Sequence, residues 1–278
     1  MKITIEDNYP RIDKFLVKYL DSMPMSLIQR LIRKKKILLN GQKCKSSQEI
    51  KVKDIIDVFY SFKTQKEEDL ILKPVLMSDK EKKNYIKLII YENSEFIVIN
   101  KPSNLAVQGG TKVKVSLKDI YEHVLEIKLY IVHRIDKDTS GLIILTKDRF
   151  SAAGISKLFL EKKIYKHYLA ITDKKFLKNN DFLINTNNED QIMKLRYRFL
   201  ENKKNNFLYL VSLLTGRKHQ IRLQFSLNNN PITNDIKFNR KITNGNLGLC
   251  AYSIKFNYKK NFYCFKLRYE EILNLFDF

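Results

Sequence analysis

The sequence predicts an α+β protein, with a small α/β module followed by a larger domain on a mixed, largely antiparallel sheet with flanking helices. The 278 residues are enough for one large domain or two of unequal size. The apolar content of 44% and aromatic content of 12% can fill a sizeable core. Helical periodicity marks the first part of the chain, whereas short β-like apolar runs dominate from residue 85 onward. Many strands with a few helices indicate the α+β class.

Two short helices open the N-terminal module, which we place at residues 1–62. Residues 11–20 carry apolar side chains at helical spacing. A second helix is predicted to begin near Ser26, because Ser26 and Gln29 have the spacing of a capping box. The β part of the module is predicted at residues 37–39, at the turn pair Asn40-Gly41 and at residues 55–60.

A polar stretch separates this module from the second domain. Residues 63–84 are rich in Lys, Glu, Asp and Gln, which favours a linker, and the second domain then spans residues 85–278. Helices are predicted there at residues 150–161 and 217–228, and strands at 96–99, 142–145, 165–171, 194–200 and 207–214.

The charge balance favours a polyanionic partner. The chain has 52 basic and 30 acidic residues, a net charge of +22, which suits nucleic acid or an anionic membrane surface. AT-rich coding is an alternative source of the many Lys, Asn and Ile residues. The sequence has no run of 18 consecutive apolar residues, so we expect no membrane-spanning helix.

The three cysteines, Cys44, Cys250 and Cys264, are too sparse for a disulfide framework and fit a reducing compartment. The N-terminus has no apolar segment of signal length, so the expected location is the cytoplasm. No Cys-x-x-Cys or His-x-x-x-His spacing occurs, so no metal site is expected.

A group of basic side chains lies along the second predicted helix and its end. Such a group would contact the phosphates of RNA without reading its sequence. An ordinary solvated face of a helix explains the same residues. This basic cluster consists of Arg30, Arg33, Lys34, Lys35 and Lys36.

A dense polar segment, residues 133–141, directly precedes the predicted strand at 142–145. Loops that lead into a rigid element often carry functional sites. Its carboxylates, Asp136 and Asp138, stand beside several cations, and an Asp beside an Arg stays ionised and available as a nucleophile. A surface turn with local hydrogen bonds explains the same spacing without any chemistry.

The polar segment resembles the signature of the RluA-type pseudouridine synthases, which implies that Asp136 is the essential catalytic residue. It reads His133-Arg134-Ile135-Asp136-Lys137-Asp138-Thr139-Ser140-Gly141-Leu142. Further blocks resemble the family in the expected order. They lie at residues 100–103 with 107–110, at 166–170, which implies Tyr168 as the active-site tyrosine, and at 214–222, which implies Arg222 as the basic partner of the nucleophile.

The N-terminal module resembles the S4 RNA-binding domain over about residues 10–60. An S4 module ahead of the catalytic domain is most similar to the synthases of the large ribosomal subunit. The resemblance therefore implies isomerisation of specific uridines in 23S rRNA. The alternatives are a non-catalytic RNA-binding or ribosome-assembly protein on this fold, and a synthase acting on another rRNA stem-loop or on tRNA. The matching residues are Arg11 to Leu16, Met25 to Lys34, Ile37, Asn40-Gly41, Val52 and Asp54.

The implied reaction breaks a C–N glycosidic bond and remakes it as a C–C bond. Asp136 would attack the sugar, stabilise it or deprotonate it while the uracil detaches and rotates. Arg222 would keep Asp136 ionised through a bidentate pair, and Tyr168 would face the base and offer a phenol for proton transfer. No step requires a metal or a redox cofactor.

The remaining residues of these blocks are expected to contact RNA or to support the loops. Arg134 would stack in the space left by the flipped uridine or clamp a phosphate. Near the C-terminus the sequence departs from the family, since residues 229–239 and Cys250 replace its usual Gly-x-Pro-Ile, Tyr-Gly and His. We also expect RNA contact from Arg217, loop support from His133, Thr139, Gly141 and His219, and a monomeric protein.

Overall fold

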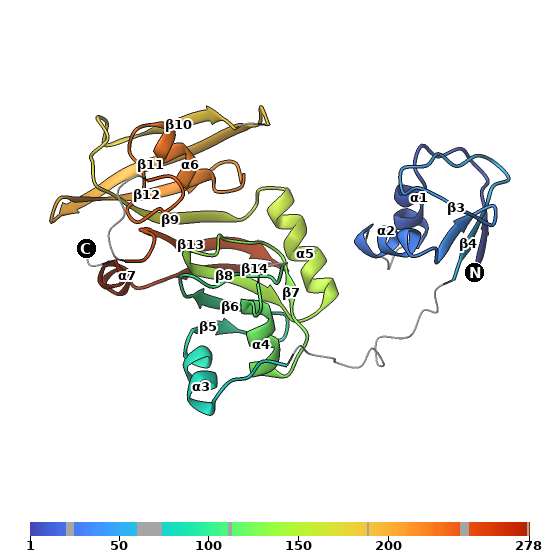
Figure 1. Cartoon of the computed structure of the whole chain (residues 1–278), viewed down its shortest axis with the longest axis horizontal. Coiled ribbons are helices and arrows are strands. Elements are labelled where there is room, and N and C mark those ends of the chain that lie inside the picture. The colour runs from blue at the N-terminus through green and yellow to red at the C-terminus, as the bar shows by residue number, and fades with distance from the viewer. Residues whose placement is uncertain (21–24, 60–73, 111–112, 188, 240–244, 277) are drawn as a thin grey trace. The chain divides into compact units, whose positions relative to one another are not determined.

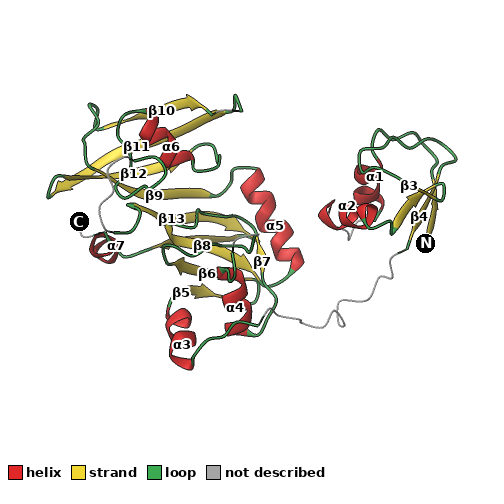
Figure 2. Cartoon of the chain, in the orientation of Figure 1, coloured by secondary structure: helices red, strands yellow, loops and turns green. Residues whose placement is uncertain are grey.

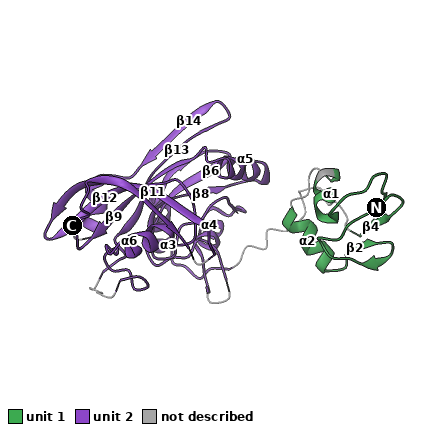
Figure 3. Ribbon diagram, turned by 90° about the horizontal axis from the view of Figure 1, so that it is seen from above, with its two compact units in different colours: residues 1–69 green, residues 70–278 purple. Residues whose placement is uncertain are grey.

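A computed structural model describes residues 1–20, 25–59, 74–110, 113–187, 189–239, 245–276 and 278. The chain divides into two compact units, Met1–Asp69 and Leu70–Phe278 (Figures 1 and 3). Both units combine helices with sheets that are mostly antiparallel, which confirms the predicted α+β class.

The first unit packs two amphipathic helices against a small sheet with the strand order β1-β4-β2-β3. The helices bury apolar stripes that include Ile12 and Ile28. Asn40 and Gly41, with φ of 51° and 73°, make the left-handed turn between β2 and β3. The elements are β1 (Lys2–Thr4), α1 (Ile12–Tyr19), α2 (Met25–Arg33), β2 (Ile37–Leu39), β3 (Gln42–Lys43) and β4 (Ile55–Val58).

The predicted capping box of the second helix is wrong. Ser26 lies inside α2 rather than at its cap. Gln29 instead donates through Nε2 to Asp13 at 3.0 Å, and the buried Asp13 also accepts two hydrogen bonds from Arg11. Gln29 therefore joins α2 to α1 rather than closing the start of α2.

The second unit is built on one sheet with the strand order β10-β11-β12-β9-β13-β8-β6-β5, flanked by helices (Figure 2). The paired strands are antiparallel except for β13 and β8, which are parallel. The elements are α3 (Asp79–Lys87), β5 (Ile89–Glu92), β6 (Phe96–Lys101), α4 (Leu117–Leu125), β7 (Tyr130–Ile131), β8 (Ser140–Thr146), α5 (Arg149–Leu160), β9 (Tyr165–Thr172), β10 (Asn180–Thr186), β11 (Ile192–Lys203), β12 (Asn206–Leu213), α6 (Gln220–Leu227), β13 (Leu249–Tyr258), β14 (Asn261–Lys266) and α7 (Tyr269–Leu275).

Apolar cores lie on both faces of this sheet. Helices α4 and α6 supply Tyr121 and Phe225 to one core, where Tyr168 of β9 also lies. Helices α5 and α7 pack on the other, which holds Ile155 and Leu169. Because side chains alternate along a strand, Tyr168 faces α6 whereas Leu169 faces away from it.

Part of the predicted linker, residues 63–84, belongs to the second unit. Residues 60–73 lie outside the described part of the chain. Val75 is buried in the core beside α4, and the following residues form α3. Ser78 caps α3 and exchanges hydrogen bonds with Glu81, which makes a capping box.

Candidate active site

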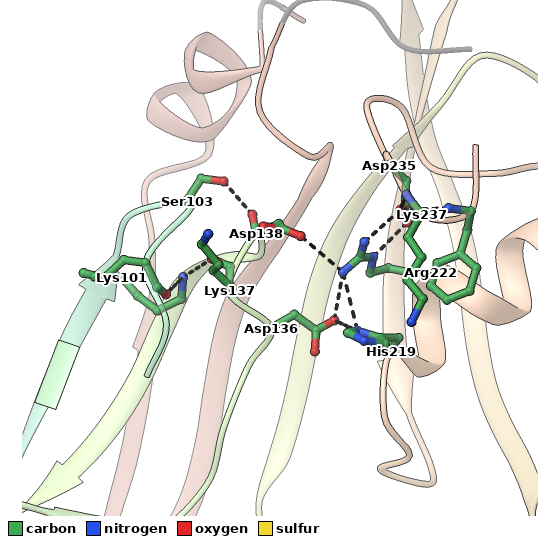
Figure 4. A network of polar contacts seen from close by, with 11 residues as sticks. Lys101, Ser103, Asp136, Lys137, Asp138, His219, Arg222, Asp235 and Lys237 are labelled. Carbon is green, nitrogen blue, oxygen red and sulfur yellow. Dashed lines mark hydrogen bonds and ion pairs between the residues drawn. The ribbon is translucent and has the colours of Figure 1, made fainter. Parts of the chain in front are cut away.

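The loop between β7 and β8, strand β9 and the start of α6 surround one pocket. Asp136, Tyr168 and Arg222, far apart in the sequence, all line it. Figure 4 shows the polar contacts between the loop and α6. The other lining residues are Arg134, Ile135, Thr139, Lys166, Leu213, Gly216, Arg217, His219, Gln220, Ile221 and Leu249.

Asp136 presents a partly exposed carboxylate to this pocket. Its Oδ2 lies 2.8 Å from Nδ1 of His219 and 3.5 Å from Nη1 of Arg222 (Figure 4). Burial by itself would raise the pKa of Asp136. The hydrogen bond and charge of His219, together with Arg222, outweigh burial and lower this pKa below its ordinary value. Asp136 is therefore ionised at neutral pH.

Arg222 makes its bidentate pair with Asp235 and not, as expected, with Asp136. Its Nε and Nη2 each donate to one Asp235 oxygen at 2.8 Å, and both side chains are buried. The remaining Nη1 lies 3.5 Å from Asp136 and 3.6 Å from Asp138. Asp235 thus holds the guanidinium, whose remaining Nη1 faces the loop between β7 and β8. Sequence reasoning did not assign Asp235, although the divergent block at residues 229–239 contains it.

Tyr168 is a buried phenol on β9. Burial first, and the charge of Asp136 second, raise the pKa of Tyr168. The phenol therefore stays protonated at neutral pH. It can offer a ring face or donate a hydrogen bond, which is compatible with the proton transfer expected of it.

His219, expected to support its loop, lies directly against the carboxylate of Asp136. It precedes α6 with a left-handed backbone, φ 52°. Gln220 closes the same turn, since its Oε1 accepts hydrogen bonds from the Arg217 N–H and the Thr215 hydroxyl at 2.9 Å each. This turn places an imidazole N–H donor at the candidate nucleophile.

His133 is a neutral ring near the start of the loop between β7 and β8. Its Nε2 accepts the backbone N–H of Ile144 at 2.9 Å, and the ring stacks on Phe159 with centroids 4.5 Å apart. Burial, with a smaller contribution from Lys166, lowers the pKa of His133 to about 3. A ring that stays neutral and bonded to β8 suits a supporting position.

Lys101 is a buried cation that sequence reasoning left unassigned. Its Nζ donates to the carbonyls of Pro102, Leu105 and Lys137 at 2.7 to 2.9 Å. Burial lowers the pKa of Lys101 to about 8, although nearby carboxylates oppose this shift. Because Lys137 adjoins Asp136, this ammonium ties the loop that carries Asp136 to the end of β6. A lysine at the end of a buried strand was the available signal.

Short contacts fix the end of the loop as it enters β8. Thr139 is buried and donates its N–H to the Asp136 carbonyl at 3.2 Å. Gly141 has φ +106°, and a Cβ there would lie 2.4 Å from the Ala251 carbonyl oxygen. Only glycine fits where β8 approaches β13 this closely.

The residues expected to contact RNA are exposed. Arg134 and Arg217 border the pocket of Asp136. The basic cluster lies in the first unit, where Lys35, with φ 57°, follows the end of α2. All five side chains of the cluster are exposed, whereas Leu31 and Ile32, which lie between Arg30 and Arg33 in the sequence, are buried.

The described residues contain no group of three or more His, Cys, Asp or Glu side chains placed to hold a metal ion. Cys44, Cys250 and Cys264 are free thiols. In the same part of the chain, no helix has the length and apolar character needed to cross a membrane.

Comparison with known proteins identifies the family. Residues 95–227 match the RNA pseudouridylate synthase model, and residues 10–56 match the S4 domain. The chain is 31% identical to ribosomal large subunit pseudouridine synthase C of Rickettsia prowazekii over 266 residues, 85% of this chain and 86% of that protein. It is 33% identical to the protein of the same name from Buchnera aphidicola over 250 residues, 83% and 77% of the two chains.

A solved structure shows the same fold. Human RNA pseudouridylate synthase domain containing 4 superposes with a TM-score of 0.58 at 21% identity, over 69% of this chain and 94% of that one. This protein therefore belongs to the RNA pseudouridylate synthases, enzymes that isomerise uridine in RNA. Within that class it is a member with an S4 domain ahead of the synthase domain.

Proposed function

We propose that this protein converts specific uridines of 23S ribosomal RNA to pseudouridine, with Asp136 as the nucleophile. The observation that carries the proposal is the ionised Asp136 carboxylate at a pocket, held by His219 and Arg222. The relatives named as ribosomal large subunit synthases support the choice of RNA.

In the proposed reaction the uridine leaves its stack and enters the pocket, while Arg134 at the rim supports the displaced strand. Asp136 attacks C1′ of the ribose as the bond from C1′ to N1 of uracil breaks. The uracil rotates against Tyr168, and its C5 bonds to C1′ as the carboxylate leaves. The proton lost from C5 is balanced by the proton gained at N1, so the product is an isomer.

The chain's own residues supply three things to this reaction. His219 and Arg222 keep Asp136 charged and oriented. Lys101 and Gly141 fix the loop that carries it. The basic cluster and Arg217 contribute positive charge for the RNA backbone. We further propose a monomer that works in the cytoplasm, which the unpaired cysteines suit.

Mapping of pseudouridines in ribosomal RNA tests the proposed substrate. RNA from cells with and without this protein is compared at every uridine. We expect defined 23S positions to lose pseudouridine without it and regain it when the chain is restored. A loss confined to tRNA or 16S rRNA would contradict the 23S assignment, and no loss would favour a non-catalytic RNA-binding role.

A further inference from the structure

Strands β10 and β11 present an open sheet face that the active site does not use. It combines exposed apolar and basic side chains in adjacent cross-strand positions. In register, Phe182 faces Arg196 and Ile184 faces Lys194. Phe182 is 48% exposed and Ile184 is 61% exposed. We name Phe182, Ile184, Lys194, Arg196 and Arg198 the outer sheet face.

This surface points away from the catalytic pocket. Along β11, Leu195 and Tyr197 are buried in the core beneath α6, so Arg196 and Arg198 project from the opposite side. Tyr168 of the pocket belongs to the same core as Tyr197. One RNA strand bound on the outer sheet face would therefore not occupy the pocket of Asp136.

The arrangement resembles the chemistry by which proteins hold unpaired nucleotides. Lys194 Nζ lies 5.2 Å from the centroid of the Phe182 ring, and the Arg196 guanidinium lies 5.9 Å from it. An exposed ring between cations can stack a base while the cations meet its phosphates. A shallow hollow between β11 and β12, which includes both arginines, is lined by Arg196, Tyr197, Arg198, Leu210 and Ser212.

The positive charge here is not neutralised locally. Neither Arg196 nor Arg198 forms an ion pair among the described residues. Arginine is also scarce, with 11 of the 52 basic residues, yet two alternate on this one strand. The nearby carboxylates are engaged: Asp181 pairs with Lys178, and Glu201 accepts the Tyr269 hydroxyl. A planar guanidinium suits bases and phosphates better than a lysine does.

We propose that the outer sheet face binds single-stranded RNA, with a base stacked on Phe182 and phosphates on Arg196 and Arg198. It would hold an unpaired segment of the RNA outside the catalytic pocket. The inference rests on the proposed function only for the identity of the substrate as RNA.

A tryptophan reporter tests the proposal, because the chain contains no tryptophan. The full chain with Phe182→Trp is titrated with a single-stranded oligouridylate and with a duplex of the same length. We expect the single strand to quench the indole emission saturably and the duplex to leave it almost unchanged. Should Phe182→Trp fail to fold by circular dichroism, Ile184→Trp places the reporter on the same surface.

Two double variants that remove equal charge distinguish binding by the outer sheet face from a general effect of net charge. In the reporter background, Arg196→Gln with Arg198→Gln should weaken binding about tenfold and lower the slope of log K against log salt by about 1.4. Lys80→Gln with Lys83→Gln on α3 removes the same charge from exposed positions and should change neither. An equal effect of both pairs would overturn the proposal.

Two further outcomes would also overturn it: no quenching by single-stranded RNA, or equal quenching by anionic vesicles, which would indicate a lipid surface. Adding Asp136→Asn to the reporter should leave the quenching unchanged. The test of the outer sheet face is therefore independent of whether Asp136 is the nucleophile.

Discussion

Asp136 owes its charge to two neighbours that act at different distances. His219 hydrogen-bonds to the carboxylate at 2.8 Å, whereas Arg222 approaches no closer than 3.5 Å because Asp235 holds most of its guanidinium. The nearer group therefore orients the Asp136 carboxylate, and the farther one supplies a fixed positive charge. Each contribution can be removed separately.

Replacing His219 with alanine should shift the acid limb of the pH–rate profile to higher pH. The wild-type Asp136 pKa lies below its ordinary value, and the lost hydrogen bond is a main cause of that lowering. A higher pKa protonates the nucleophile at a pH where the wild type is still ionised. At pH 7 the carboxylate remains charged, and we expect about a tenfold loss of rate from poorer orientation alone.

Single-turnover conversion of an RNA substrate between pH 4 and 8 measures both effects. His123→Ala in α4, outside the set of pocket-lining residues, serves as the control. An acid limb that stays in place in His219→Ala would contradict the role assigned to this hydrogen bond.

Asp235→Asn should reduce both stability and activity. The pair with Arg222 is buried, and a neutral partner leaves the guanidinium charge poorly compensated, which costs about 3 kcal/mol. Thermal unfolding and single-turnover rates are measured side by side. Asp181→Asn, which removes an exposed ion pair with Lys178, should leave both nearly unchanged. An unaltered melting temperature in Asp235→Asn would refute the buried pair.

For single residues, the sequence predicted which side chains line the pocket better than it predicted their ion pairs and hydrogen bonds. Asp136, Tyr168 and Arg222 were assigned from motifs, and they do line one pocket. Asp235 and Lys101 were not assigned, because for each of them the contact that matters to the pocket is made only in the folded chain. Arg222 meets Asp235 across thirteen residues, and Lys101 meets Lys137 across thirty-six.

Among the elements, β8 follows the loop that carries Asp136 and approaches β13 closely. Gly141 lies at this parallel junction, opposite Ala251. Its φ of +106° and the absence of space for a Cβ both require glycine. The position of Asp136 is thereby coupled to a strand more than a hundred residues later in the chain.

Gly141→Ala should destabilise the second unit by about 3 kcal/mol, since strain and the clash with Ala251 add together. Denaturant unfolding measures the change. Gly110→Ala is the control, because a Cβ there meets nothing within 4 Å. Equal unfolding free energies of the two variants would contradict this, because they would show that β8 and β13 accommodate the added methyl group at no cost in stability.

The spacing of apolar residues predicted single helices and strands well, but it did not predict every strand of the sheet or where the second unit begins. The predicted helix at residues 150–161 and strand at 142–145 are present as α5 and β8 with shifted ends. Strand β13, central in the sheet, was not predicted. Its Ser253, Lys255 and Asn257 interrupt the apolar run, although most of the strand is buried. The linker was also drawn too long, since the charged residues of α3 concealed a helix that packs through Tyr85.

For the whole molecule, the net charge of +22 is spread over both units, and the S4 unit carries its own basic cluster. Electrostatic contacts to phosphate release counterions, so affinity depends on salt in proportion to the number of contacts. The salt dependence of binding therefore reports whether the S4 unit engages the RNA.

Arg30→Gln with Arg33→Gln should lower the slope of log K against log salt by up to about 1.8 for structured rRNA. The two side chains are exposed, so the fold should persist. Filter binding at several salt concentrations gives the slope. Lys43→Gln with Lys45→Gln removes equal charge elsewhere in the same unit and should have less effect. Equal slopes for both pairs would assign the contribution to net charge alone.

We expect Asp136 to act as the nucleophile of this uridine isomerase. The most direct measurement compares conversion and binding of 23S rRNA by the Asp136→Asn and Asp138→Asn variants. We predict that Asp136→Asn forms no detectable pseudouridine yet binds the RNA like the wild type, whereas Asp138→Asn still converts it. Pseudouridine formation by Asp136→Asn at a rate near that of the wild type would contradict this role of Asp136.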